Sequence, residues 1–137
     1  MSRVVSLRLK ADEGKRLERI AREFSRSVGA TASLLLREKL REEEFPFIEF
    51  RNSPVGRQAY IKRQRVTVWQ VLWLARHYDM DAGRVGQHLG WREEPVHSAL
   101  AYARAYPDEI EPIVDEVEST SYEDLKRRIP WIEKAPA

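Results

Sequence analysis

The segment RVVSLRLK, residues 3–10, alternates between apolar and polar side chains, with Val5, Leu7 and Leu9 on one side. This period of two predicts a strand with one buried face. The next seventy or so residues have mostly helical periodicity, so no second strand follows nearby. A single strand leaves its backbone N–H and C=O groups unpaired. The strand therefore needs a partner from elsewhere.

Two helices are predicted after this strand. The first opens at Ala11-Asp12-Glu13 and carries an apolar stripe of Leu17, Ile20, Ala21 and Phe24. The second begins at Thr31, a residue type that caps helices, and continues to about Glu44. The stretch SRSVGAT between them is predicted to be a loop. The second helix has leucines around so much of its surface that more than one side must be buried.

Residues 1–45 thus form a predicted unit of strand, helix and helix, which is too small to bury a stable core alone. Two copies related by a two-fold axis solve this problem, because their strands pair antiparallel above four helices. Such pairing buries Val5, Leu7 and Leu9 in a shared core. It also turns an outer edge toward solvent, formed by Val4, Ser6, Arg8 and Lys10. A two-stranded ribbon of this kind fits the major groove of B-DNA.

These residues resemble the ribbon-helix-helix family of dimeric DNA-binding proteins. VVSLRLK is similar to the strand that contacts bases in that family, and GATASLLLREKLRE to its second helix. The resemblance implies that Val4, Ser6 and Arg8 contact base edges. It further implies that the backbone N–H groups of Thr31 and Ala32 hold a phosphate.

Residues 46–57 are predicted to be a linker or an extended arm. Pro46, Asn52-Ser53, Pro54 and Gly56 are typical of turns and irregular structure. The chain resumes regular structure over residues 58–118, where AYIKRQRVTV predicts a short hairpin that leads into a helix.

Three helices are predicted within residues 58–118. Thr67 caps the first, Asp81 precedes the second, which ends at Gly90, and Pro95 lies in the first turn of the third. Their inward-facing positions are Val68, Val71, Leu72, Ala75, Val85, Leu89, Val96, Ala99, Leu100 and Ala103. Trp69 and Trp73 are four residues apart and are expected to be core or interface. A helix, a short turn with glycine and a second helix form a helix-turn-helix, so the predicted fold class is mainly α.

Residues 56–114 resemble the small VapB-type antitoxin domain of bacterial and archaeal toxin–antitoxin operons. The matching stretches are Gly56-Arg57, IKRQRVTVWQVL and SALAYARAYPDEI. The family pattern usually has a glycine where Arg63 stands. The two resemblances together imply an antitoxin of a type II toxin–antitoxin system. Such a protein binds operator DNA of its own operon as a homodimer or higher even oligomer, and neutralises a PIN-like ribonuclease toxin.

Residues 119–137 are predicted to be a toxin-binding tail. The segment is too short for a core of its own, yet it has large apolar residues, namely Tyr122, Leu125, Ile129, Trp131 and Ile132. Packing onto this chain or its dimer mate and docking on another protein are both open at this point. The resemblance implies a nuclease that holds Mg²⁺ or Mn²⁺ on carboxylates. The sequence LKRRIPW adds the hypothesis that Arg127 and Arg128 insert into that acidic site and displace the metal.

Charge is unevenly distributed along the chain, although its net value is only +2. Residues 1–41 hold 11 Lys/Arg against 5 Asp/Glu, and residues 51–92 hold 8 against 2, so each stretch has a balance of +6. Residues 93–137 hold 5 Lys/Arg against 11 Asp/Glu, a balance of −6. This asymmetry favours a polyanion partner for the basic parts and another partner for the acidic end. Simple solvation of a charged surface is the other explanation.

Residues for catalysis are not evident in the sequence, and no enzyme activity or cofactor is expected. There is no cysteine, and the three histidines His77, His88 and His97 lie on separate predicted helices without metal-ligand spacing. No glycine-rich phosphate loop is present. The chain has neither a run of 18 apolar residues nor a signal-peptide pattern, so we expect a cytoplasmic location without membrane contact.

Two other functions fit the same sequence. A stand-alone ribbon-helix-helix repressor has no toxin partner, and its helix-turn-helix adds a second DNA contact through Arg84, Arg92 or Arg104. A protein-binding or assembly module leaves the basic strand merely solvated. DNA affinity at moderate salt and the identity of the neighbouring gene distinguish these possibilities.

Overall fold

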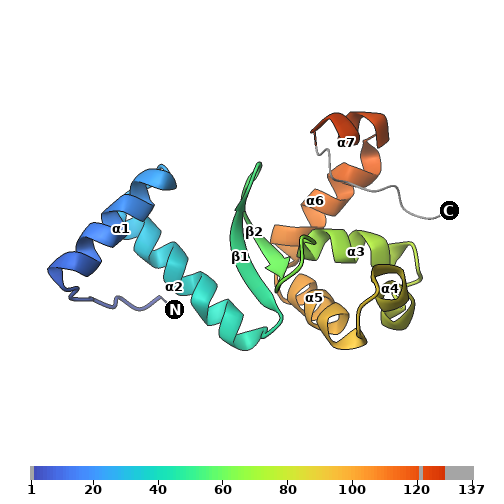
Figure 1. The fold of residues 1–137 in the computed structure, drawn as a ribbon, viewed down its shortest axis with the longest axis horizontal. Coiled ribbons are helices and arrows are strands. Elements are labelled where there is room, and N and C mark those ends of the chain that lie inside the picture. Colours follow the sequence, from blue (N-terminus) through green and yellow to red (C-terminus); the bar gives the residue numbers. More distant parts are fainter. Residues whose placement is uncertain (1, 121, 129–137) are drawn as a thin grey trace. The chain divides into compact units, whose positions relative to one another are not determined.

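The computed structural model describes residues 2–120 and 122–128 and divides into two units, residues 1–41 and 42–137 (Figure 1). The side chains of Tyr122, Leu125 and Arg128 lie outside this description. The protein is mainly helical, as the sequence predicts, and its described part has one two-stranded antiparallel sheet. Each unit is considered by itself below.

The first unit contains helix α1 (Ala11–Glu23) and most of helix α2 (Val28–Glu44). Helix α1 begins as predicted, and the carboxylate of Glu13 accepts a hydrogen bond from the N–H of Lys10 at 3.0 Å. Residues 2–10 have no regular structure in this single chain. The predicted strand is one that forms against a second chain, so it stays a prediction.

Helix α2 begins at Val28, three residues before the predicted start. Ser27 caps it, because its Oγ accepts a hydrogen bond from the N–H of Ala30 at 3.1 Å. The hydroxyl of Thr31 instead donates to the carbonyl of Ser27 at 2.8 Å, inside the first turns of the helix. The prediction that Thr31 caps this helix is therefore wrong. Serine and threonine are both good caps, and the chain uses the earlier one, which shortens the predicted loop to residues 24–27.

The second unit begins with a β-hairpin. Strand β1 (Ile48–Ser53) pairs antiparallel with strand β2 (Gly56–Ile61), with Ile48 opposite Ile61 and Ser53 opposite Gly56. The turn between the strands contains Pro54 and is followed by Gly56, two of the residues predicted to interrupt regular structure. Residues 46–57, predicted to be a linker or arm, instead hold β1 and the start of β2. The alternation of Ile48 and Phe50 with Glu49 and Arg51 is a two-residue period, but the apolar cluster before it obscures the pattern.

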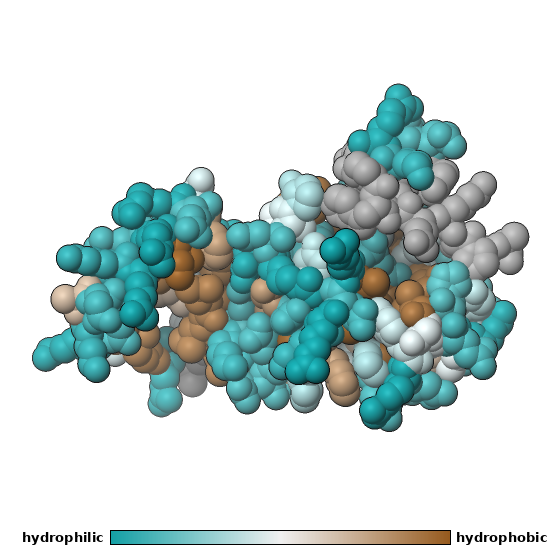
Figure 2. Space-filling model, in the orientation of Figure 1, coloured by the Kyte–Doolittle hydropathy of each residue, from teal (hydrophilic) through white to brown (hydrophobic). Residues whose placement is uncertain are grey.

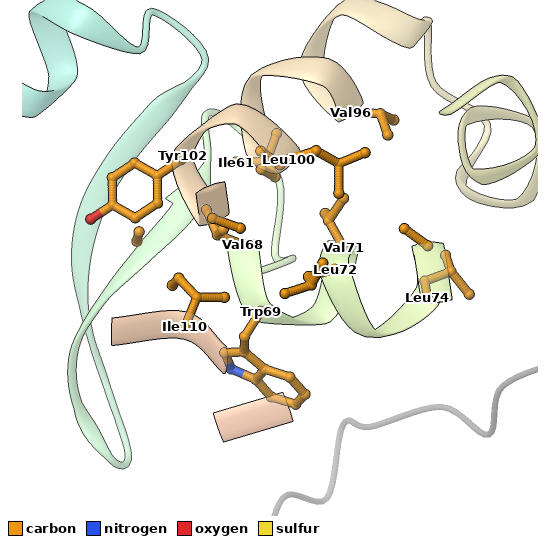
Figure 3. Close-up of a cluster of buried hydrophobic side chains, with 14 of the residues drawn as sticks. Ile61, Val68, Trp69, Val71, Leu72, Leu74, Val96, Leu100, Tyr102 and Ile110 are labelled. Atoms are coloured by element: carbon orange, nitrogen blue, oxygen red, sulfur yellow. The ribbon is translucent and has the colours of Figure 1, made fainter. Parts of the chain in front are cut away.

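Four helices follow the hairpin, namely α3 (Val68–Arg76), α4 (Ala82–Leu89), α5 (Glu93–Ala105) and α6 (Pro107–Ser119). Helix α3 packs against α5 and α6, and α4 packs against α5. Figure 3 shows Val68, Trp69 and Val71 of α3 among side chains of β2, α5 and α6. The predicted inward positions of α3 and α5 are all buried, and so is Trp69. Helix α7 (Tyr122–Arg128) comes last.

Local signals fix the ends of these helices. Thr67 caps α3 and Asp81 caps α4, each through a side-chain oxygen that accepts an N–H three residues later, at 3.3 and 3.1 Å. Gly90 ends α4 with φ +71°, a left-handed conformation that glycine adopts without strain. The predicted roles of Thr67, Asp81 and Gly90 at these helix ends are confirmed. The turn from Gly90 to α5 is short, so α4 and α5 have the helix-turn-helix arrangement.

We expect Thr67→Ala to lower the free energy of unfolding by about 1–2 kcal/mol, because α3 loses its cap at a buried position. The measurement is chemical denaturation followed by tryptophan fluorescence. Thr67→Ser keeps the hydroxyl and is the matched control, with a smaller loss. Equal losses for the two variants would show that the methyl group, not the cap, stabilises this site.

Candidate nucleic-acid interface

The N-terminal segment, residues 2–10, carries the predicted DNA-contacting residues. Every residue from 2 to 10 is exposed in the single chain. Exposure is 65% for Val5, 69% for Leu7 and 46% for Leu9, so the three predicted core residues have almost no cover. Ser6 and Arg8 are also exposed, Val4 is 94% exposed, and Lys10 holds the N-cap position of α1. The segment presents both its apolar and its polar side chains without a partner strand.

The helices of the first unit share this lack of cover. Among residues 2–41, Ala21 is the one buried hydrophobic residue, and most of the predicted α1 stripe is half-buried. On α2, Leu36 is 48% and Leu40 61% exposed. Figure 2 shows apolar side chains gathered on the visible face of this unit. A unit of about forty residues with so little buried apolar surface needs a partner for stability.

The predicted phosphate contact used the N–H groups of Thr31 and Ala32, but α2 begins three residues before Thr31. The N–H of Thr31 already donates to the carbonyl of Ser27 at 2.9 Å, and Thr31 is fully buried. Ala32 follows it inside the helix. Neither N–H group is therefore at the end of the helix. The N–H groups that lack an intrahelical partner are those of the first turn, which begins at Val28.

In the helix-turn-helix, Arg84 and Arg92 have acidic partners, and the first turn of α5 is acidic. The guanidinium of Arg92 donates two hydrogen bonds to the carboxylate of Glu94, at 3.2 and 3.3 Å. Arg84 lies 3.9 Å from Asp79 and stacks on Tyr78. Glu93 and Glu94 occupy the first turn of α5, the part of a recognition helix that enters the groove in such proteins. Negative charge there repels phosphate, although Arg104 is exposed.

The hydrogen bond from Arg92 lowers the pKa of Glu94 below its usual value and raises that of the Arg92 guanidinium. Helix α5 therefore begins with an ion pair between Arg92 and Glu94.

The predicted toxin-binding residues lie in and after α7. Arg127 is exposed and forms an ion pair with Asp124 of the same helix. Tyr122, Leu125 and Arg128 belong to α7, but their side chains lie outside the described residues. Ile129, Trp131 and Ile132 lie outside them entirely. The structure thus brings Arg127 to a solvent-facing position and leaves the other predicted contacts as predictions.

The turn after β2 is not among the functional elements predicted from the sequence. Lys62, Arg63 and Arg65 are exposed there, in a turn closed by a hydrogen bond from the N–H of Ile61 to the carbonyl of Val66 at 2.9 Å. The predicted hairpin around this turn is present, with Tyr60 bridged to Thr67. Three cations in four residues were the available signal.

Histidines and acids do not converge in the described part of the chain, which has no group of three or more potential ligands for a metal ion. His77, His88 and His97 contact Trp73, Tyr78 and Glu93 respectively. No helix within residues 2–120 and 122–128 is both long and apolar enough to cross a membrane.

Comparisons with known proteins give no relatives: no family model matches the chain, and neither curated proteins nor solved structures give a match.

We expect the carboxyl group of Glu94 to titrate at a lower pH than an unpaired glutamate, because the Arg92 guanidinium stabilises its charged form. Carbon-detected NMR of the side-chain carboxyl during a pH titration measures this. Arg92→Gln moves the Glu94 midpoint up toward the ordinary value, whereas Arg104→Gln on the same helix leaves it in place. A midpoint that Arg92→Gln does not change would contradict the ion pair.

Proposed function

We propose that this protein is the antitoxin of a type II toxin–antitoxin system. It binds operator DNA as a dimer through residues 1–45 and neutralises a PIN-like ribonuclease toxin through its C-terminal part. The observation that carries the proposal is the uncovered N-terminal segment, in which exposed apolar residues alternate with exposed polar ones.

A second copy of this segment is the partner that accounts for the alternation. Antiparallel pairing of two such segments satisfies their backbone hydrogen bonds and covers Val5, Leu7 and Leu9 together with the open leucines of α2. The side chains of Ser6 and Arg8 then form an edge that occurs twice, once from each chain. A palindromic operator has the same two-fold symmetry.

Charge agrees with this assignment. The first unit has a balance of +6. Some of its positive charge is neutralised locally, since Arg16 lies 3.6 Å from Asp12. Arg8 has no described partner. A basic surface attracts the phosphate backbone, and base contacts from the ribbon supply the preference for one sequence.

The toxin assignment depends on the tail. Arg127 and Arg128 are the cations of the predicted contact, and Arg127 is exposed at the end of the described chain. An arginine that enters a metal-binding acidic site displaces a cation by charge, which would inhibit a nuclease that requires Mg²⁺. The acidic helix α6 fits a partner other than DNA, which favours an antitoxin over a repressor that binds DNA alone.

Two single substitutions at neighbouring positions test the dimer and the DNA contact separately. Leu7→Glu tests the dimer interface, and Arg8→Glu tests the DNA contact. We expect Leu7→Glu to give monomers with reduced helix content, because it places a charge in the shared core. Arg8→Glu leaves the dimer intact and lowers operator affinity by at least about 1–3 kcal/mol, through loss of a base contact. Light scattering and circular dichroism report assembly, and fluorescence anisotropy reports binding to DNA from upstream of the gene.

The proposal of a DNA-binding dimer fails if the wild-type protein has equal affinity for that DNA and for a random duplex. It also fails if Leu7→Glu remains a dimer, since the apolar side of the segment then lies outside the interface.

Arg127→Ala combined with Arg128→Ala tests the toxin contact. We expect this pair to abolish inhibition of the neighbouring gene product in a ribonuclease assay, because the positive charge directed at its metal site is gone. Arg84→Ala with Arg104→Ala removes the same charge from the same unit and should leave inhibition unchanged. Full inhibition by the tail variant would remove these arginines from the mechanism.

A further inference from the structure

The turn at residues 62–65 carries positive charge that is not neutralised within the described chain. No hydrogen bond or ion pair to a described residue involves the side chains of Lys62, Arg63 or Arg65, and all three are exposed. Two other arginines of this unit have acidic partners: Arg51 lies 2.8 Å from Glu49, and Arg76 lies 3.2 Å from Asp115. The turn is therefore a local concentration of free positive charge.

The backbone of this turn is held in place from several sides. The N–H of Lys62 donates to the carbonyl of Phe47 at 2.7 Å, and the N–H of Arg63 donates to the carboxylate of Glu49 at 3.2 Å. From inside the turn, Arg51 donates to the carbonyls of Ile61 and Gln64, and its guanidinium stacks on Tyr60 at 4.4 Å. The three cations therefore project from a fixed frame, which lowers the entropy cost of binding.

Arg63 occupies a strained position at the tip. Its φ is +66°, a left-handed conformation in which glycine is free of strain and arginine is not. The surrounding hydrogen bonds maintain this conformation. Strain of this kind is concentrated at functional positions. Ser25, Asp79 and Met80 also have positive φ, and Arg63 is the one cation among these described non-glycine residues.

The N-terminal ends of helices α5 and α6 are unfavourable for a polyanion. Helix α5 begins with Glu93 and Glu94, and α6 begins with Asp108 and Glu109. Helix α6 continues with Glu111, Asp115, Glu116 and Glu118. Repulsion from these acids disfavours contact with a polyanion through α5 and α6.

We propose that Lys62, Arg63 and Arg65 form a second DNA-binding element, which contacts the phosphate backbone of the duplex bound by the first unit. This inference rests on the proposed operator binding. It assigns the extra DNA contact to the turn after β2 and not to the helix-turn-helix. Contacts to phosphate add affinity without sequence preference, and each one steepens the salt dependence of binding.

The test compares two full-length variants that each lose three cations. The turn variant is Lys62→Gln, Arg63→Gly and Arg65→Gln, and the control is Arg84→Gln, Arg92→Gln and Arg104→Gln. Affinity for upstream DNA and for a random duplex is measured between about 50 and 200 mM salt. The turn variant should flatten the log–log salt slope by about 0.9 per lost contact and keep its preference for the upstream DNA. The control should keep the wild-type slope.

Single substitutions of Arg63 give a second test, which does not require three changes at once. Arg63→Gly removes the charge and the strain together, so DNA affinity falls by about eightfold at 0.1 M salt while the unfolding temperature does not fall. Arg63→Lys keeps the charge and should retain affinity within about threefold. A loss of affinity that accompanies a loss of stability would indicate a structural role.

The outcomes separate this inference from the proposed function. If the wild-type protein binds neither duplex, operator binding and this inference both fail. If it prefers the upstream DNA but the turn variant has the wild-type slope, or the control flattens the slope equally, the inference alone fails. A turn variant with an unchanged slope and a smaller mass by light scattering would overturn the inference and assign the turn to an acidic surface of another copy.

Discussion

Residues 2–41 lack an apolar core of their own, and the organisation of the molecule depends on that constraint. Ala21 is the one hydrophobic side chain buried there, while Leu7, Leu36 and Leu40 remain largely in water. Burial of apolar surface contributes about 25 cal/mol per Å², so this unit gains most of its stability from whatever covers it. With a second copy as the cover, folding and association become a single event whose free energy depends on protein concentration.

The second unit, in contrast, has a hydrophobic core of its own. Helix α3 is buried on nearly all sides, and Phe45 packs edge-on against Tyr102 with ring centroids 5.2 Å apart. The phenol of Tyr102 donates to Glu109 at 2.9 Å, which joins α5 to α6. Phe50 of β1 contacts the same Tyr102 ring with centroids 6.2 Å apart, so the hairpin is attached to α5 through an aromatic contact. A turn at the end of such a hairpin has a defined position on its unit, which suits it to a fixed pattern of phosphates.

Helices α3, α4 and α5 could be predicted from the sequence, because they have clear periodicity and strong end signals such as Thr67, Asp81 and Gly90, whereas α6 was not predicted. The β1–β2 hairpin was not predicted, since Phe45 and Phe47 obscure the alternation and its turn residues also suit a linker. Thr31 was chosen over Ser27 because both residue types cap helices, and only the backbone geometry distinguishes them. Arg63 was noted as a substitution for glycine, but its left-handed conformation required coordinates. The N-terminal strand stays a prediction, because the partner proposed for it is a second chain.

Tryptophan is distributed as unevenly as the apolar core. All four tryptophans belong to residues 42–137, with Trp69 buried and Trp73 and Trp91 half-buried, and the first unit has none. Intrinsic fluorescence therefore reports on one unit, whereas far-ultraviolet circular dichroism reports on the helices of both. A dilution series followed by the two signals can resolve whether the chain unfolds in one step or two, without any introduced label.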